Sequence, residues 1–407
     1  MRGILREEIT TLRRHFAYLD WLRGGASFLV FSYHARNLLF VDASANPGGL
    51  GLLGKAFYFI TGFGHLAVIV FFALSGCVIA NVIFSALERG DWNWQGYLLA
   101  RVTRLWVVIL PGLILTCVWD LAAWHFFPDS LPHAVPGYAG MLAVSDRQHL
   151  GIGTFFTNLF FLQTIVGPTY GSNGALWSLA NEFWYYIFFP LALVGAGASR
   201  SWLARTAGVA LAGIGLAAAG GEIAQLFPVW LMGAVAYFCW FRGLRVGAIA
   251  GRWASIATFI LAGAICSLIR ARAAQAGHPS DDFLAGMSIM LFLFFLLNTQ
   301  PPANVWLERL LSGISRMSFT LYVVHTPILV FIACFLMRGR SERWAYDLEH
   351  VGYLATIMAF VLAYAWLVYR VTEAQSARIR IFLEKHLGIT ERGATPQKDL
   401  VETNPRA

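Results

Sequence analysis

Charged residues are scarce in this chain of 407 residues. Only 13% of its residues are Asp, Glu, Lys or Arg, whereas 58% are hydrophobic. A soluble protein carries about a quarter charged residues. This deficit excludes a soluble enzyme. Together with many separate apolar runs of about 20 residues, it indicates an all-α, polytopic bundle of membrane helices.

Signals for metal binding, disulfides and nucleic-acid binding are also missing. The five cysteines lie inside apolar runs, without metal-ligand spacing or a pattern of paired disulfides. No Gly-rich phosphate loop, Gly-x-Ser-x-Gly elbow or zinc-spaced histidine pair occurs. The net charge of +8 is spread over short loops, which fits membrane topology rather than nucleic-acid binding. We therefore expect no metal, no permanently bound cofactor and no nucleic-acid partner.

The apolar runs predict about ten transmembrane helices. Residues 1–15 are basic and lack a short apolar core with a cleavage site, so we expect a cytoplasmic arm and no removable signal peptide. A membrane domain at 16–375 and a polar, fraying cytoplasmic tail at 376–407 follow. The predicted spans are 18–41, 57–84, 103–124, 175–197, 205–221, 223–241, 253–270, 283–298, 316–337 and 351–370.

Basic residues predict which side of the membrane the ends occupy. With the N-terminus inside, the cytoplasmic segments hold about three times as many Lys and Arg residues as the outer loops, which favours two cytoplasmic termini. Residues 155–166 are apolar but too short to span, so they are interfacial or re-entrant. They belong to the long outer loop at 125–174, which is either a cover over a site or ordered irregular chain.

Three ionisable residues stand inside the first apolar run. Asp20 precedes Arg23 by three residues, a pairing distance on a helix. His34 follows Arg23 after about three helical turns, so both lie on nearly one face, roughly 16 Å apart along the axis. Such residues in a bilayer indicate a functional site. The alternative is that Asp20 and Arg23 anchor the helix at the interface while His34 is a buried hydrogen-bonding group.

Two arginines begin the third span. Arg101 and Arg104 are three residues apart and share a helix face. Guanidinium groups bind phosphate oxygens through charge-assisted bonds, often two at a time. The alternative is the basic flank that any cytoplasmic helix end carries.

Small and polar residues mark two further spans. Ser75 and Gly76 in the second span allow close approach of another backbone. Trp177, Ser178 and Glu182 open the fourth span, where a carboxylate must face a protein interior or a wet cavity. Glu182 would orient an imidazole or bind a substrate hydroxyl. The alternative for Ser178 and Glu182 is a hydrogen bond between helices.

The ninth span carries Tyr322 and His325 on one face. Pro327 frees a backbone carbonyl in mid-span, which a neighbouring polar group can satisfy. His325 is a candidate for that structural role. We also place it, with Ser75, Trp177, Ser178 and Tyr322, among the candidate substrate-binding residues.

Taken in order over about residues 16–375, these stretches resemble the membrane acyltransferase 3 family of bacterial O-acyltransferases. The matching pieces are Leu19-Asp20 with Leu22-Arg23 and His34; Phe71-Phe72-Ala73-Leu74-Ser75-Gly76; Arg101-x-x-Arg104; Trp177-Ser178-Leu179 with Glu182; and Ser318 with Leu321-Tyr322, His325 and Pro327. The sequence departs from the family pattern at Ala67-Val68-Ile69, where an acid often stands. It departs a second time in the residues after Arg104. It departs a third time after Glu373, where a basic residue and a proline usually follow.

The resemblance implies transfer of an acyl group, usually acetyl, from cytoplasmic acyl-coenzyme A to a hydroxyl. By position, His34 resembles the catalytic histidine and Arg23 its companion, with Asp20 and Glu182 as further catalytic candidates. Arg101 and Arg104 resemble the arginine pair near the coenzyme's phosphates. The expected partners are acyl-coenzyme A as co-substrate, a hydroxyl acceptor and the lipid bilayer of the bacterial inner membrane.

Several functions stay open at this point. The acceptor is expected to be a cell-surface or lipid-linked glycan, such as lipopolysaccharide or exopolysaccharide, or a small molecule such as a macrolide. His34 would act as a general base or form a transient acyl-histidine. A polytopic transporter of glycans or lipids is the alternative from a different class, and a membrane sensor a third.

Overall fold

The computed structural model describes residues 2–136, 138, 147–197, 201–273, 279–299 and 313–389. Within them the chain is helical and contains no β-strand, which confirms the predicted all-α class. The helices are α1 (Arg2–Leu39), α2 (Leu52–Ile60), α3 (Gly64–Arg89), α4 (Trp94–Phe126), α5 (Leu131–Ala134), α6 (Ile152–Leu159), α7 (Trp177–Gly197), α8 (Trp202–Ala219), α9 (Gly221–Phe241), α10 (Ala248–Ala273), α11 (Pro279–Leu296), α13 (Ser318–Leu336), α14 (Leu348–Val371) and α15 (Ser376–His386).

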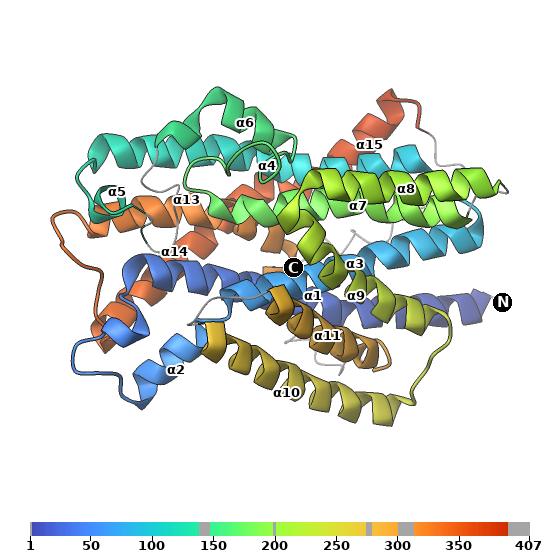
Figure 1. The fold of residues 1–407 in the computed structure, drawn as a ribbon, viewed down its shortest axis with the longest axis horizontal. Coiled ribbons are helices and arrows are strands. Elements are labelled where there is room, and N and C mark those ends of the chain that lie inside the picture. The colour runs from blue at the N-terminus through green and yellow to red at the C-terminus, as the bar shows by residue number, and fades with distance from the viewer. Residues whose placement is uncertain are drawn as a thin grey trace.

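The long helices run alongside one another in a single bundle (Figure 1). The N-terminus and α15 lie at one end of this bundle, and α2 and α5 lie at the other. Seven helical stretches among the described residues are long and apolar enough to cross a membrane. The protein is therefore a multi-pass membrane protein, and the side on which its termini lie stays a prediction.

Each of the ten predicted spans falls on helical chain. The second span, however, was predicted wrongly as one continuous helix. Instead of one helix over 57–84, the chain forms α2 and then α3, separated by a turn at Thr61 and Gly62. The Thr61 hydroxyl donates to the Phe57 carbonyl 2.7 Å away, and the Gly62 N–H donates to Phe59, which closes α2. The apolar run predicted a buried segment and could not predict this break.

The close approach predicted at Ser75-Gly76 is confirmed. A Cβ atom on Gly76 would lie 2.0 Å from the carbonyl oxygen of Trp230 in α9. Across the same contact, a Cβ atom on Gly233 would lie 1.7 Å from the carbonyl oxygen of Ala73. Reciprocal glycines bring the backbones of α3 and α9 together, which is how small residues hold membrane helices.

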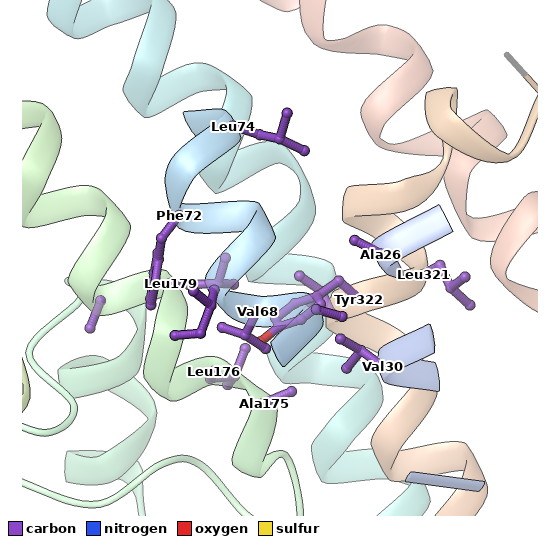
Figure 2. Packing of buried hydrophobic residues seen from close by; sticks show 14 of the residues in the cluster. Ala26, Val30, Val68, Phe72, Leu74, Ala175, Leu176, Leu179, Leu321 and Tyr322 are labelled. Carbon is purple, nitrogen blue, oxygen red and sulfur yellow. The ribbon is translucent and has the colours of Figure 1, made fainter. Parts of the chain in front are cut away.

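Apolar side chains from four parts of the chain meet at the centre of the bundle (Figure 2). They come from α1, α3, the start of α7 and α13, and all are buried. Labelled examples are Ala26 and Val30, Val68 and Phe72, Leu176 and Leu179, and Leu321 and Tyr322. The candidate polar residues are therefore set in a packed apolar surround, where an uncompensated polar group is costly.

The outer loop folds back into the bundle after α6. The Leu159 carbonyl accepts a hydrogen bond from the indole of Trp106, 3.1 Å away in the first half of α4. Phe161 and Thr164 adopt positive φ angles of 59° and 70° in the turn that follows. The chain then returns and starts α7 at Trp177, and the interfacial or re-entrant placement of residues 155–166 stays a prediction.

The two terminal segments are more ordered than the sequence indicated. The arm expected at 1–15 continues α1 from Arg2 onward. The tail expected from residue 376 begins with helix α15, which packs against α4. Residues 390–407 lie outside the described part of the chain.

The glycine contact can be tested by adding one methyl group. Gly233→Ala should destabilise the protein by about 1–3 kcal/mol or more, because α3 and α9 must separate to admit the Cβ atom. Gly263→Ala in α10 is the matched control, since nothing lies within 4 Å of its Cβ position. Thermal unfolding in detergent should show a lower midpoint for Gly233→Ala alone. Equal midpoints would show that this contact is not tightly packed.

Candidate functional site

Two histidines from different helices form a hydrogen-bonded pair. His34 Nδ1 in α1 lies 2.8 Å from His325 Nε2 in α13, and the rings stack with 10° between their planes. His325 is fully buried, whereas His34 is partly accessible. His325 occupies the middle part of α13, so the pair lies deep inside the bundle.

The contacts of this pair fix where its protons lie. His325 Nδ1 is 2.9 Å from the carbonyl oxygen of Leu321, which can only accept a hydrogen bond. A neutral imidazole has one donor and one acceptor nitrogen. In a neutral pair, His325 therefore donates from Nδ1 and accepts at Nε2, and His34 donates from Nδ1. The free lone pair of the pair then lies on His34 Nε2.

The polar residues of α1 face α13 along one stripe, as the spacing predicted. Arg23 pairs with Asp20 at 3.0 Å and donates to the Ser315 carbonyl at 3.3 Å and the Ser315 hydroxyl at 3.2 Å. One turn further, the Ser27 hydroxyl donates to the Ser318 carbonyl. Arg23 is therefore more than an interfacial anchor, because it joins α1 to the start of α13.

A small cavity of about 60 Å³ lies among α1, α3, α4, α7 and α13. Its polar walls include Arg23, Arg104, Ser178 and Glu182 from the predicted set. Its apolar walls come chiefly from α3 and α13. The full lining is Arg23, Val68, Phe71, Phe72, Arg104, Leu105, Ser178, Leu179, Glu182, Tyr186, Ser318, Phe319 and Tyr322.

Tyr322 forms the cavity wall nearest the histidine pair. Its hydroxyl lies 2.6 Å from the Ser178 hydroxyl in α7, and its ring centroid is 6.1 Å from that of His325. Figure 2 shows Tyr322 pointing from α13 toward the centre of the cluster. The cavity therefore runs from the arginines to a tyrosine one helical turn before His325.

A chain of hydrogen bonds holds Glu182 in the opposite wall. The Trp230 indole donates to the Ser75 hydroxyl at 3.1 Å, Ser75 donates to the Tyr186 hydroxyl at 3.3 Å, and Tyr186 donates to Glu182. Glu182 is bonded to Tyr186, whereas the His34 imidazole is bonded to His325. Its carboxylate lines the cavity, where it can accept a hydrogen bond from a ligand.

The carbonyl that Pro327 frees is satisfied by a residue other than His325. Asn173, in the loop just before α7, donates from Nδ2 to the Val323 carbonyl at 2.8 Å. Proline removes the N–H that would otherwise bond this carbonyl, four residues earlier. The structural role considered for His325 therefore falls to Asn173, and His325 remains available to His34.

Arg101 and Arg104 lie at the cavity end away from the histidines. Arg104 lines the cavity, and among the described residues it has no ion pair. The Arg101 Nε atom is buried without a hydrogen-bond partner in the described chain, and its guanidinium lies 5.7 Å from the Tyr97 ring centroid. Nearby, Glu373 accepts from the N–H and hydroxyl of Thr320 at the start of α13.

The structure brings most of the predicted residues to one region. Ser75 and Trp177 contact cavity-lining side chains, since Ser75 bonds Tyr186 and Trp177 packs on Phe72. Among the residues that sequence reasoning missed, Tyr186 was within reach, because it lies one helical turn after Glu182. Glu373 is far from the others in sequence, so only the fold brings it near. No cluster of three metal-ligating side chains occurs among the described residues.

The comparisons with known proteins agree with this geometry. A sequence model described as an acyltransferase domain matches residues 16–370, most of the chain. The chain belongs to the membrane acyltransferase 3 family. A Bacillus subtilis (strain 168) protein named "Putative peptidoglycan O-acetyltransferase YrhL" is 27% identical over 187 residues, which cover 46% of this chain and 25% of that relative. The match thus spans a quarter of the relative's length. No solved structure matches the chain.

The arginine pair of this acyltransferase-family protein gives a direct prediction. Arg101→Ala with Arg104→Ala should weaken coenzyme A binding about a hundredfold or more, because two charge-assisted contacts are worth about 3 kcal/mol together. The double Lys variant should recover only part of the affinity, since an ammonium lacks the planar fork. Calorimetric titration in detergent measures the coenzyme A affinity of both double variants. Unchanged affinity in the double Ala variant would show that the two arginines only mark the cytoplasmic end of the helix.

Proposed function

We propose that this protein transfers an acyl group, acetyl in the simplest case, from acyl-coenzyme A to a hydroxyl of a cell-surface or lipid-linked glycan at the bacterial inner membrane. Membership of an acyltransferase family supports the reaction class. The observation that carries the proposal is the hydrogen bond of His34 to His325, which leaves His34 Nε2 as a base inside the bundle.

His34 supplies the proton transfers that the reaction requires. The acceptor hydroxyl gives its proton to His34 Nε2 while its oxygen attacks the thioester carbonyl. As the tetrahedral intermediate collapses, the carbon–sulfur bond breaks and the departing sulfur takes the proton from His34. The products are the ester and free coenzyme A, and His34 returns to its starting form. An imidazole suits both steps because its ordinary pKa lies near neutral pH.

His325 is the positioning residue in this scheme. It holds the His34 ring by a hydrogen bond and a stacking contact, and it is itself held by the Leu321 carbonyl. As His34 accepts a proton at Nε2, its Nδ1–H bond to His325 strengthens, because a charged donor bonds more strongly. This arrangement of base and orienting group is the one expected of general-base catalysis.

The arginines suit the donor rather than the reacting atoms. Arg23 and His34 are about 16 Å apart along α1, so Arg23 cannot reach the atoms on which His34 acts. Arg23 and Arg104 instead line the cavity that ends at Tyr322. A donor with its phosphates at the arginines would extend its pantetheine arm toward Tyr322 and the histidines. Because Tyr322 closes that end, its bond to Ser178 has to open during entry.

The proposed class of acceptor is supported by one relative. The relative's name refers to peptidoglycan O-acetylation, and the match covers only part of that protein. A glycan hydroxyl is therefore the acceptor class we propose. We further propose that the acceptor enters from the side of the predicted outer loop, because Asn173 of that loop contacts α13 two residues before His325.

The proposal predicts a large loss in the His34→Gln variant. Membrane vesicles that contain the protein, radiolabelled acetyl-coenzyme A and a glycan fraction should yield labelled glycan. His34→Gln should lower the rate about a hundredfold or more, as loss of a general base does. His125→Gln is the matched control, since His125 is exposed at the end of α4.

Two results would contradict the proposal. Full labelling by a well-expressed His34→Gln protein would remove His34 from the chemistry. If a cytosolic extract is added and label is found only in one of its small molecules, a small-molecule acceptor would replace the glycan.

A further inference from the structure

Helix α15, the last helix of the described chain, carries Arg380 at a half-buried position. In α15 the half-buried positions are Ser376, Ala377, Arg380, Leu383 and Glu384, whose spacing is that of one helix face. This face packs against α4. Arginine is unusual on a packed stripe, because its charge must be compensated. Glu384, one turn further along α15, supplies part of this compensation through an ion pair with Arg380 at 2.6 Å.

Arg380 lies near Arg101, the first arginine of the α4 pair, on a helix that packs against α4. It is close enough to Arg101 for their positive charges to repel each other. Its Nε atom donates to Glu384 at 2.6 Å, which orients the guanidinium. Two neighbouring guanidinium groups, one with a buried Nε atom that lacks a partner, form a site suited to an anion with several oxygens.

The order of the arginines along α4 indicates which part of a ligand they meet. Arg104 lines the cavity, whereas Arg101 lies one turn nearer the end of the bundle that holds α15 and the N-terminus (Figure 1). A coenzyme A molecule with its thioester toward His34 has its diphosphate next along its length. Its ribose 3′-phosphate lies further toward the bundle end.

We propose that Arg380 and Arg101 together bind the ribose 3′-phosphate of the acyl donor, so that α15 is part of the donor site. This inference rests on the function proposed above. It adds a binding residue from outside the residues 16–370 that the family model matches. The diphosphate then falls to Arg104 and Arg23 deeper in the protein.

Comparing coenzyme A with 3′-dephospho-coenzyme A tests the assignment. The wild-type protein in detergent should bind coenzyme A about tenfold or more tightly than the dephospho form, since a charged contact is worth roughly 1.5–3 kcal/mol. Arg380→Gln should remove this preference and leave affinity for the dephospho form unchanged. Arg380→Lys should retain part of it.

The control is Arg378→Gln, on the exposed face of the same helix, where Arg378 donates to Gln375. It should keep the full preference. An unchanged preference in Arg380→Gln, or an equal loss for both ligands, would overturn the assignment and leave α15 a structural helix. Failure of the wild-type protein to bind either ligand would instead refute the proposed function.

Discussion

The hydrogen bond between His34 and His325 is the constraint on which this site depends. It joins α1 to α13 at the centre of the bundle, and the Leu321 carbonyl determines its direction. The Arg23 and Ser27 contacts hold the same two helices in register nearer the N-terminal end of α1. One face of α1 thus carries Arg23, which lines the cavity, and His34, which lies beyond the Tyr322 end of the cavity.

The loop at 160–176, between α6 and α7, supplies polar groups that this centre requires. It returns to the bundle interior, so that α7 begins there and presents Ser178 and Glu182 to the cavity. Asn173 satisfies the carbonyl that Pro327 frees, which leaves His325 to bond His34. Asp120 anchors the segment, because it accepts from the Ser172 N–H at 2.7 Å and the Ser172 hydroxyl at 2.6 Å. The Val323 carbonyl and the Asp120 carboxylate are thereby paired with protein groups.

Much of this could be predicted from the sequence, because lipid constrains composition and spacing strongly. Each predicted span fell on helical chain, one of them divided between α2 and α3, and the Asp20–Arg23 pair followed from the i, i+3 rule. The break between α2 and α3 could not be predicted, since the run stays apolar across it. The partner of His34 could not be predicted either. Residues 291 positions apart meet only through the packing of α1 on α13, and spacing within one helix holds no such information.

The central claim is that His34 Nε2 carries the free lone pair. Nitrogen NMR of protein with isotope-labelled histidine, at neutral pH in detergent, measures this directly, because protonated and bare ring nitrogens resonate far apart. The His34 signals are those that disappear in His34→Gln. The account predicts a proton on His34 Nδ1 and a bare Nε2, with the same tautomer on His325. A proton on His34 Nε2 would contradict it.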